Sequence, residues 1–151
     1  NGVLHHVDLG KARGELARVM KPEAKACFIE PLKYNPVIEV YRFMAGTVRT
    51  EDENPLSFDD IESFRQNFRE VGHREFWLAT LAVFLKFYVV DRVHPKKERY
   101  WKKIYTDAAA LGPIFNPLKR VDDRLLALLP PLRHLCWTSV ITVARPLKTD
   151  A

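Results

Sequence analysis

The sequence predicts an α/β domain with parallel strands, on three observations. Its 151 residues, 47% of them hydrophobic and 28% charged, suit one globular domain by length and composition. Residues 2–31 contain two short apolar runs with a helical pattern between them, the order of a βαβ unit, whose two strands are parallel. Residues 138–145 form a β-branched run that predicts a last strand. Because the first residue is Asn1 rather than Met, we expect the chain to begin inside a longer protein.

The predicted βαβ unit has three elements. Residues 2–6 are interpreted as the end of a buried strand that runs into a loop. Asp8 offers an N-cap to a helix whose apolar residues recur at helical spacing until Pro22 stops it. Residues 26–29 are a continuous apolar run, typical of a strand buried on both faces, and Pro31 ends this run.

The middle of the chain predicts two helices and a strand. Turn residues precede residues 37–44, which are compatible with a short helix. Ser57 and Asp60 resemble a capping box, which marks the start of a helix. The apolar residues of this helix, up to Phe68, are expected to face the core. Residues 71–77 predict the next strand.

The segment between the last two strands is too long for a hairpin connection, which predicts a helical insertion over residues 78–137. Its first helix, residues 78–90, is apolar nearly all round and must be buried by another element. The leucine-rich residues 125–135 are the simplest partner, with a second subunit, a lipid surface or an apolar substrate as alternatives. We expect the insertion to cover the substrate near the carboxyl edge of the sheet.

A basic window in the insertion carries four of the five net positive charges of the chain. It could meet phosphate or an anionic membrane surface beside Tyr100 and Trp101, or it could be a solvated helix face. Because the excess charge is local, nucleic acid is not the expected partner. The longest apolar run is interrupted by Lys86 and is shorter than the roughly 20 residues that span a bilayer. The window holds Glu98 and five basic residues: Lys96, Lys97, Arg99, Lys102 and Lys103.

Three ionisable residues follow the first two predicted strands. His5 and His6 end the first strand, and Glu30 ends the second. Because the carboxyl ends of adjacent parallel strands share one edge of the sheet, we expect these side chains to meet beside the loop of Tyr34 and Asn35. Two imidazoles and a carboxylate are a candidate acid/base site. In the alternative interpretation, Glu30 caps a nearby backbone group and the histidines fill a loop.

Other chemical motifs are absent from the sequence. It has no glycine-rich phosphate loop, no Gly-x-Ser-x-Gly elbow and no His-x-x-x-His helix. Two adjacent histidines are poorly placed to bind one metal ion, so no metal site is expected. Cys27 and Cys136 lie far apart in apolar surroundings and are interpreted as buried free thiols. We therefore expect a cytoplasmic protein, with membrane association as an alternative.

The order of several short motifs resembles the second half of a class I S-adenosylmethionine-dependent methyltransferase of the type 11-like group. In that family "LHH" follows the fourth strand, and "RVLKPGG" ends the next helix and leads into the fifth strand. This chain has VLHH at residues 3–6, ELARVMKP at 15–22 and IEP at 29–31. Its residues 35–56 are similar to a bacterial subgroup with the pattern "EP…NP…RT.DE.PL", and its last strand is similar to the antiparallel seventh strand.

The resemblance implies the carboxyl-terminal part of a Rossmann-like doubly wound sheet, with an antiparallel last strand and a helical insertion. It makes residues 1–151 a single domain, the carboxyl-terminal half of a methyltransferase. Two departures matter. Pro22 is followed by Glu23 and Ala24 instead of two glycines, and the glycine-rich cofactor loop and the acidic residue that holds the ribose are missing. We therefore expect a missing amino-terminal half as the partner, and little activity from this chain alone.

The reaction implied by the resemblance is methyl transfer from S-adenosylmethionine to a small-molecule acceptor, a hydrophobic one being a candidate. His5 is the first candidate for the base, followed by His6 and Glu30. The resemblance places Asn1, Gly2, Val3 and Leu4 at the cofactor. It places Tyr34, Asn35 and Arg49 on the substrate side.

Two further hypotheses come from other functional classes. The chain could be a non-catalytic interaction module of the same fold, or a peripheral binder of anionic surfaces through residues 96–103. Binding of the cofactor distinguishes the enzyme from the module. A steep salt dependence of binding favours the peripheral binder.

Overall fold

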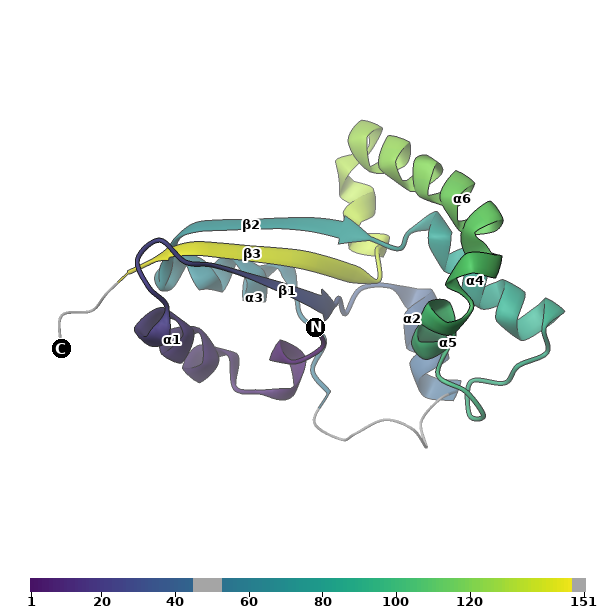
Figure 1. Ribbon diagram of the computed structural model, residues 1–151, viewed down its shortest axis with the longest axis horizontal. Coiled ribbons are helices and arrows are strands. Elements are labelled where there is room, and N and C mark those ends of the chain that lie inside the picture. The colour runs from purple at the N-terminus through teal and green to yellow at the C-terminus, as the bar shows by residue number, and fades with distance from the viewer. Residues whose placement is uncertain (45–52, 148–151) are drawn as a thin grey trace. The chain divides into compact units, whose positions relative to one another are not determined.

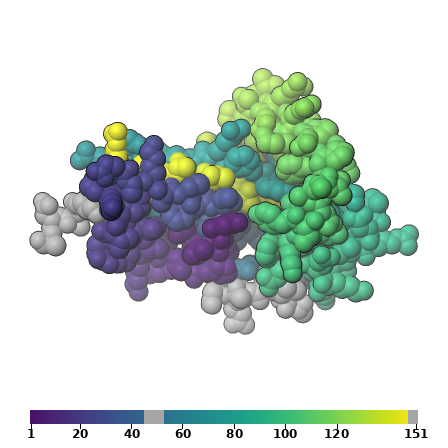
Figure 2. All heavy atoms as spheres, in the orientation of Figure 1, coloured from purple at the N-terminus to yellow at the C-terminus, as the bar shows by residue number. Residues whose placement is uncertain are grey.

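The computed structural model describes residues 1–44 and 53–147, which form two compact units (Figures 1 and 2). The described part of unit 1 comprises residues 1–34, 53–75 and 138–147. The described part of unit 2 comprises residues 35–44 and 76–137. Unit 2 thus contains the expected insertion together with the segment that follows Tyr34.

A three-stranded sheet organises unit 1. Its strands are β1 (Lys25–Pro31), β2 (Phe68–Phe76) and β3 (Thr138–Pro146), in the order β1-β3-β2. The last strand therefore lies in the middle, antiparallel to β1 in a register that pairs Phe28 with Ile141. Strand β3 is also antiparallel to β2, because Leu147 bonds to Asn67 at one end of the pair and Ser139 bonds to Glu75 at the other. The protein is a mixed α/β structure with an antiparallel sheet, and the predicted antiparallel pairing of the last two strands is confirmed.

The strand predicted at residues 2–6 is wrong. Gly2 has a φ of 65°, which glycine adopts without strain, and Leu4–His6 form a 3₁₀ helix, η1. The amides that a strand would use in a ladder donate instead to the side chain of Glu30. Among the described residues, β1 therefore has no parallel partner strand, and the parallel contact near it is one isolated bridge from Leu32 to Leu56.

Two helical segments lie against the same face of this sheet (Figure 1). Helix α1 (Leu9–Val19) begins at Asp8, whose carboxylate accepts from the amide of Lys11, so the predicted N-cap is confirmed. Helix α3 (Phe58–Glu62) has the predicted capping box of Ser57 and Asp60. It continues only as the 3₁₀ helix η2 (Ser63–Gln66), because Phe68 already begins β2. The unit 1 core includes the fully buried side chains of Ile61, Phe64, Phe68, Ile141 and Val143.

Apart from Phe76, the last residue of β2, the regular elements in the described part of unit 2 are all helical. Its elements are α2 (Pro36–Met44), η3 (Ala79–Leu81), α4 (Ala82–Leu85), the π-helical turn η4 (Lys86–Val90), α5 (Tyr100–Thr106), α6 (Ala108–Leu128) and η5 (Pro130–Leu135). The helix predicted at residues 78–90 is thus three short segments of different pitch. Helix α6 includes Pro113 and Pro117 and ends at Leu128, within the leucine-rich residues 125–135.

Residues 78–90, the apolar segment of unit 2, do not pack against the partner that the sequence led us to expect. Val83, Phe84 and Phe87 are buried in one cluster with Tyr100 of α5 and Leu111 of α6. The beginning of α6, rather than the leucine-rich residues 125–135, therefore covers this segment. Leu128, Leu129 and Leu135 are exposed instead, and so are Leu85, Val89 and Val90 on the outer side of the apolar segment.

The two cysteines differ in exposure, and the helices among the described residues are too short or too polar to cross a membrane. Cys136 is buried as expected, but Cys27 is exposed, because β1 is covered on one face only. Across residues 1–44 and 53–147, no helix is both long and apolar enough to cross a membrane.

Candidate functional site

The carboxylate of Glu30 is the centre of the candidate site. Its side chain is fully buried near the end of β1. Oε1 accepts hydrogen bonds from the amide of Val3 at 2.9 Å and from the amide of Leu4 at 3.1 Å. Oε2 lies 2.7 Å from Nδ1 of His5, the second residue of η1. The structure therefore brings together His5 and Glu30, as the sequence led us to expect, although η1 rather than a strand presents His5.

The protonation of this pair follows from the partners of Glu30. Burial raises the pKa of Glu30, but the hydrogen bonds from His5, Val3 and Leu4 outweigh burial and leave the pKa below its usual value. Glu30 is therefore an ionised acceptor near neutral pH, and the proton in the 2.7 Å contact belongs to Nδ1 of His5. Within the described ranges no hydrogen bond reaches Nε2 of His5, so this nitrogen carries the free lone pair whenever the imidazole is neutral.

The loop that carries His5 is fixed on both sides. The amide of Gly2 donates to the carbonyl of Ile29 at 2.8 Å, and the amide of Asn54 donates to the carbonyl of His5 at 2.8 Å. The ring of the exposed His6 lies against that of His5, with centroids 4.0 Å apart. A histidine oriented by a buried carboxylate can accept and return a proton at its other nitrogen.

The residues predicted on the substrate side have structural partners. The hydroxyl of Tyr34 accepts from the amide of Phe58 at 3.1 Å, and the two rings stack. Asn35 caps α2, because its Oδ1 accepts from the amide of Ile38 at 3.0 Å, and its Nδ2 donates to the carbonyl of Leu135. Tyr34 belongs to unit 1 and Asn35 to unit 2. Arg49 lies outside the described residues.

The residues predicted to bind S-adenosylmethionine have no free backbone amide at Gly2, Val3 or Leu4 to donate to it. The amides of Gly2, Val3 and Leu4 all donate to protein oxygen atoms, and the side chain of Leu4 is buried. Only Asn1 at the start of this segment is exposed with a polar side chain. This segment therefore has no amide of these three residues left to hold the cofactor.

Sequence reasoning missed two buried carboxylates. Glu75 accepts from the hydroxyl of Ser139 at 3.1 Å and lies 2.6 Å from Nδ1 of His73, an arrangement that joins β2 to β3. The spacing of His73 and Glu75 is the available signal, because residues two apart share one face of a strand. Asp122 in α6 accepts from the amides that begin η3, and nothing near it in the sequence indicates this role.

No protein-family model matches the chain. A search of curated proteins also finds no significant match. In the part of the chain that the structure describes, no three His, Cys, Asp or Glu side chains are grouped as metal ligands.

Glu30 is expected to make the stability of unit 1 depend on pH. Because its pKa is lower in the folded than in the unfolded protein, its stabilising effect is present above the unfolded value of about 4.3 and is lost as the pH falls through the folded pKa. Glu30→Gln should therefore lower the free energy of unfolding by about 2–3 kcal/mol at neutral pH. In urea unfolding this difference should shrink below pH 4 or so. The exposed Glu23→Gln serves as the control, and a difference for Glu30→Gln that stays constant with pH would contradict the assignment.

Proposed function

We propose that this chain takes part in S-adenosylmethionine-dependent methyl transfer to a small-molecule acceptor, with His5 as the general base. One observation carries the proposal: buried, ionised Glu30 holds Nδ1 of His5 at 2.7 Å. This contact leaves Nε2 as the basic atom. The Ser-His-Asp triad uses the same tautomer and orientation to remove a proton from its nucleophile.

Two features of the fold support the proposal. His5 stands in the "LHH" motif of the resemblance, directly before a helix and a strand in the expected order. The last strand, β3, is antiparallel to both of its neighbours, as the resemblance implies for the last strand of the sheet. Strands β1 and β2 consequently run in the same direction on either side of it.

The step assigned to this chain is a proton transfer. Nε2 of His5 takes the proton of an acceptor hydroxyl or amine as the acceptor atom becomes a nucleophile, and Glu30 stabilises the imidazolium that forms. A base is needed only where the acceptor must lose a proton, which favours an oxygen or nitrogen nucleophile. Glu30 is a positioning residue in this account, because it acts on the acceptor only through His5.

We assign the binding of the cofactor to residues other than Asn1, Gly2, Val3 and Leu4. S-adenosylmethionine, when bound, supplies the methyl group. The amides of Gly2, Val3 and Leu4 are already used within the protein, and the sequence has no glycine-rich loop or ribose-holding acid to replace them. We assign these parts to an amino-terminal half that lies outside this sequence.

The 151-residue chain alone is therefore expected to bind S-adenosylmethionine weakly or not at all. Isothermal titration calorimetry on the isolated chain measures this directly. Tight binding with a stoichiometry of one would show that the chain carries a complete cofactor site, against the assignment above.

Transfer of a radiolabelled methyl group tests the function itself. The full-length protein that contains this sequence is incubated with methyl-labelled S-adenosylmethionine and an organic extract of its source cells. We expect label to appear in the organic phase, since the acceptor comes from the organic extract, whereas the charged cofactor stays in water. Failure of the full-length protein to bind the cofactor would instead favour a non-catalytic module of the same fold.

A further inference from the structure

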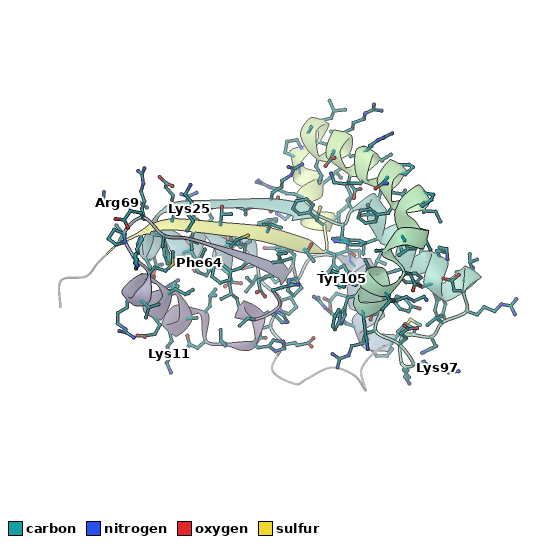
Figure 3. The ribbon with its side chains drawn as sticks, in the orientation of Figure 1. Lys11, Lys25, Phe64, Arg69, Lys97 and Tyr105 are labelled. Carbon is teal, nitrogen blue, oxygen red and sulfur yellow. The ribbon has the colours of Figure 1, made fainter. Side chains whose placement is uncertain are left out.

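Unit 2 has an exposed surface on which basic and aromatic side chains alternate. Lys96, Lys97 and Lys102 are exposed, and Trp101 and Tyr105 are 45% and 66% exposed. Trp101 and Tyr105 are four residues apart in α5, so they share one face of that helix. We call these five residues the basic–aromatic surface; Figure 3 labels Lys97 in the loop before α5 and Tyr105 on α5.

The three lysines of this surface are not compensated by acidic side chains. Lys103 forms an ion pair with Asp107 at 2.6 Å, and Lys86 forms one with Asp91 at 2.8 Å. By contrast, no ion pair involves Lys96, Lys97 or Lys102 within residues 1–44 and 53–147. Their positive charge is therefore available to an anionic partner.

The opposite side of α5 is anchored in the core of unit 2. Tyr100 is buried against Phe84 and Phe87, and its hydroxyl donates to the carbonyl of Val93. The amide of Tyr100 donates to the hydroxyl of Tyr41 at 3.3 Å. These contacts fix the helix, so that Trp101 and Tyr105 are presented outward.

Exposed aliphatic residues lie close to the loop that carries Lys96 and Lys97. Val89 and Val90 are 65% and 69% exposed at the end of η4. The ring of Tyr88, next to them, lies 6.1 Å from the ring of His94, and Nδ1 of His94 accepts from the amide of Lys96 at 3.2 Å. Aliphatic side chains gain nothing from the phosphates of a nucleic acid, whereas the acyl boundary of a membrane receives them.

We propose that the basic–aromatic surface binds an anionic membrane surface. The lysines neutralise acidic lipid headgroups, and Trp101 and Tyr105 lie at the headgroup level, where amphipathic rings are favoured. The binding is peripheral, and it places unit 2 at the membrane, independently of the chemistry proposed for His5.

Sedimentation with lipid vesicles tests this inference on the full chain. The vesicles contain either phosphatidylcholine alone or two parts phosphatidylcholine to one part phosphatidylserine. We expect binding only to the acidic vesicles, and weaker binding as salt is raised. The triple variant Lys96→Gln/Lys97→Gln/Lys102→Gln should bind about 100-fold more weakly, because each lysine near such a surface contributes about fivefold.

A second triple variant separates the surface from the net charge. Lys11→Gln/Lys21→Gln/Lys25→Gln removes the same charge from exposed positions of unit 1 and should bind nearly as well as the unchanged chain. Equal losses in the two variants would overturn the proposal, as would no binding of the unchanged chain to acidic vesicles. Tighter binding to duplex DNA than to acidic vesicles would identify nucleic acid as the partner instead.

The aromatic residues give an independent readout. Insertion of Trp101 at the headgroup level should shift the tryptophan fluorescence of the chain to shorter wavelength when acidic vesicles are added. In Trp101→Phe this shift should disappear while binding persists. A shift of the same size in Trp101→Phe would show that the surface is not the part that meets the lipid.

Discussion

His5→Ala is expected to lower the turnover of methyl transfer by the full-length protein about 100-fold or more, while its affinity for S-adenosylmethionine stays nearly unchanged. The reason is that, in the proposed function, His5 removes a proton from the acceptor and has no assigned contact with the cofactor. Glu30→Gln should also reduce kcat, with a smaller change in KM, because the imidazole remains but its tautomer is no longer fixed. Steady-state kinetics with a fixed acceptor measures both variants, and calorimetry measures the cofactor.

His134→Ala is the matched control, because it removes an exposed histidine from unit 2. Its turnover should equal that of the unchanged protein. If His5→Ala retained full turnover, His5 would be a structural loop residue that only anchors η1 to Glu30. A parallel loss of cofactor affinity would instead place His5 at the cofactor.

Asp122→Ala is expected to destabilise unit 2 by about 3–4 kcal/mol. The buried carboxylate of Asp122 accepts from the amides of Leu78 at 3.2 Å, Ala79 at 2.5 Å and Thr80 at 3.3 Å. It also accepts from the hydroxyl of Thr80 at 2.7 Å. Removing it leaves these donors buried or partly buried without an acceptor at the start of η3, where no residue of the helix can replace it.

The next residue in the chain provides the control for this variant. Asp123 is exposed on α6 and forms a surface ion pair with Lys119 at 2.6 Å. Surface pairs of this kind contribute at most about 1 kcal/mol, so Asp123→Ala should change unfolding little. Thermal and urea unfolding of the two variants should therefore differ clearly. Equal stability would mean that solvent or another group replaces the carboxylate of Asp122.

Features that depend on neighbouring residues were predictable from the sequence. The capping box of Ser57 and Asp60 and the N-cap of Asp8 are local, because side chain and amide are three residues apart. The strands β1, β2 and β3 follow from short apolar or β-branched runs. The pairing of His5 with Glu30 was expected from strand topology, and it occurs although residues 2–6 are not a strand.

Features that depend on distant contacts were not predictable. The turn at Gly2 replaces a strand because Glu30, more than twenty residues later, takes the amides of Val3 and Leu4. Asp122 caps a helix that begins over forty residues earlier. Likewise, the apolar pattern of residues 78–90 does not reveal that Leu111 at the beginning of α6 buries one side of it.

The general-base proposal depends most directly on which nitrogen of His5 carries the proton. Nitrogen-15 NMR of the imidazole rings in the labelled chain, at a pH where His5 is neutral, distinguishes the two tautomers. We predict that Nδ1 of His5 is protonated and Nε2 is not, and that Glu30→Gln abolishes this preference. A proton on Nε2 in the unchanged chain would contradict the account, because His5 would then have no basic atom to offer the acceptor.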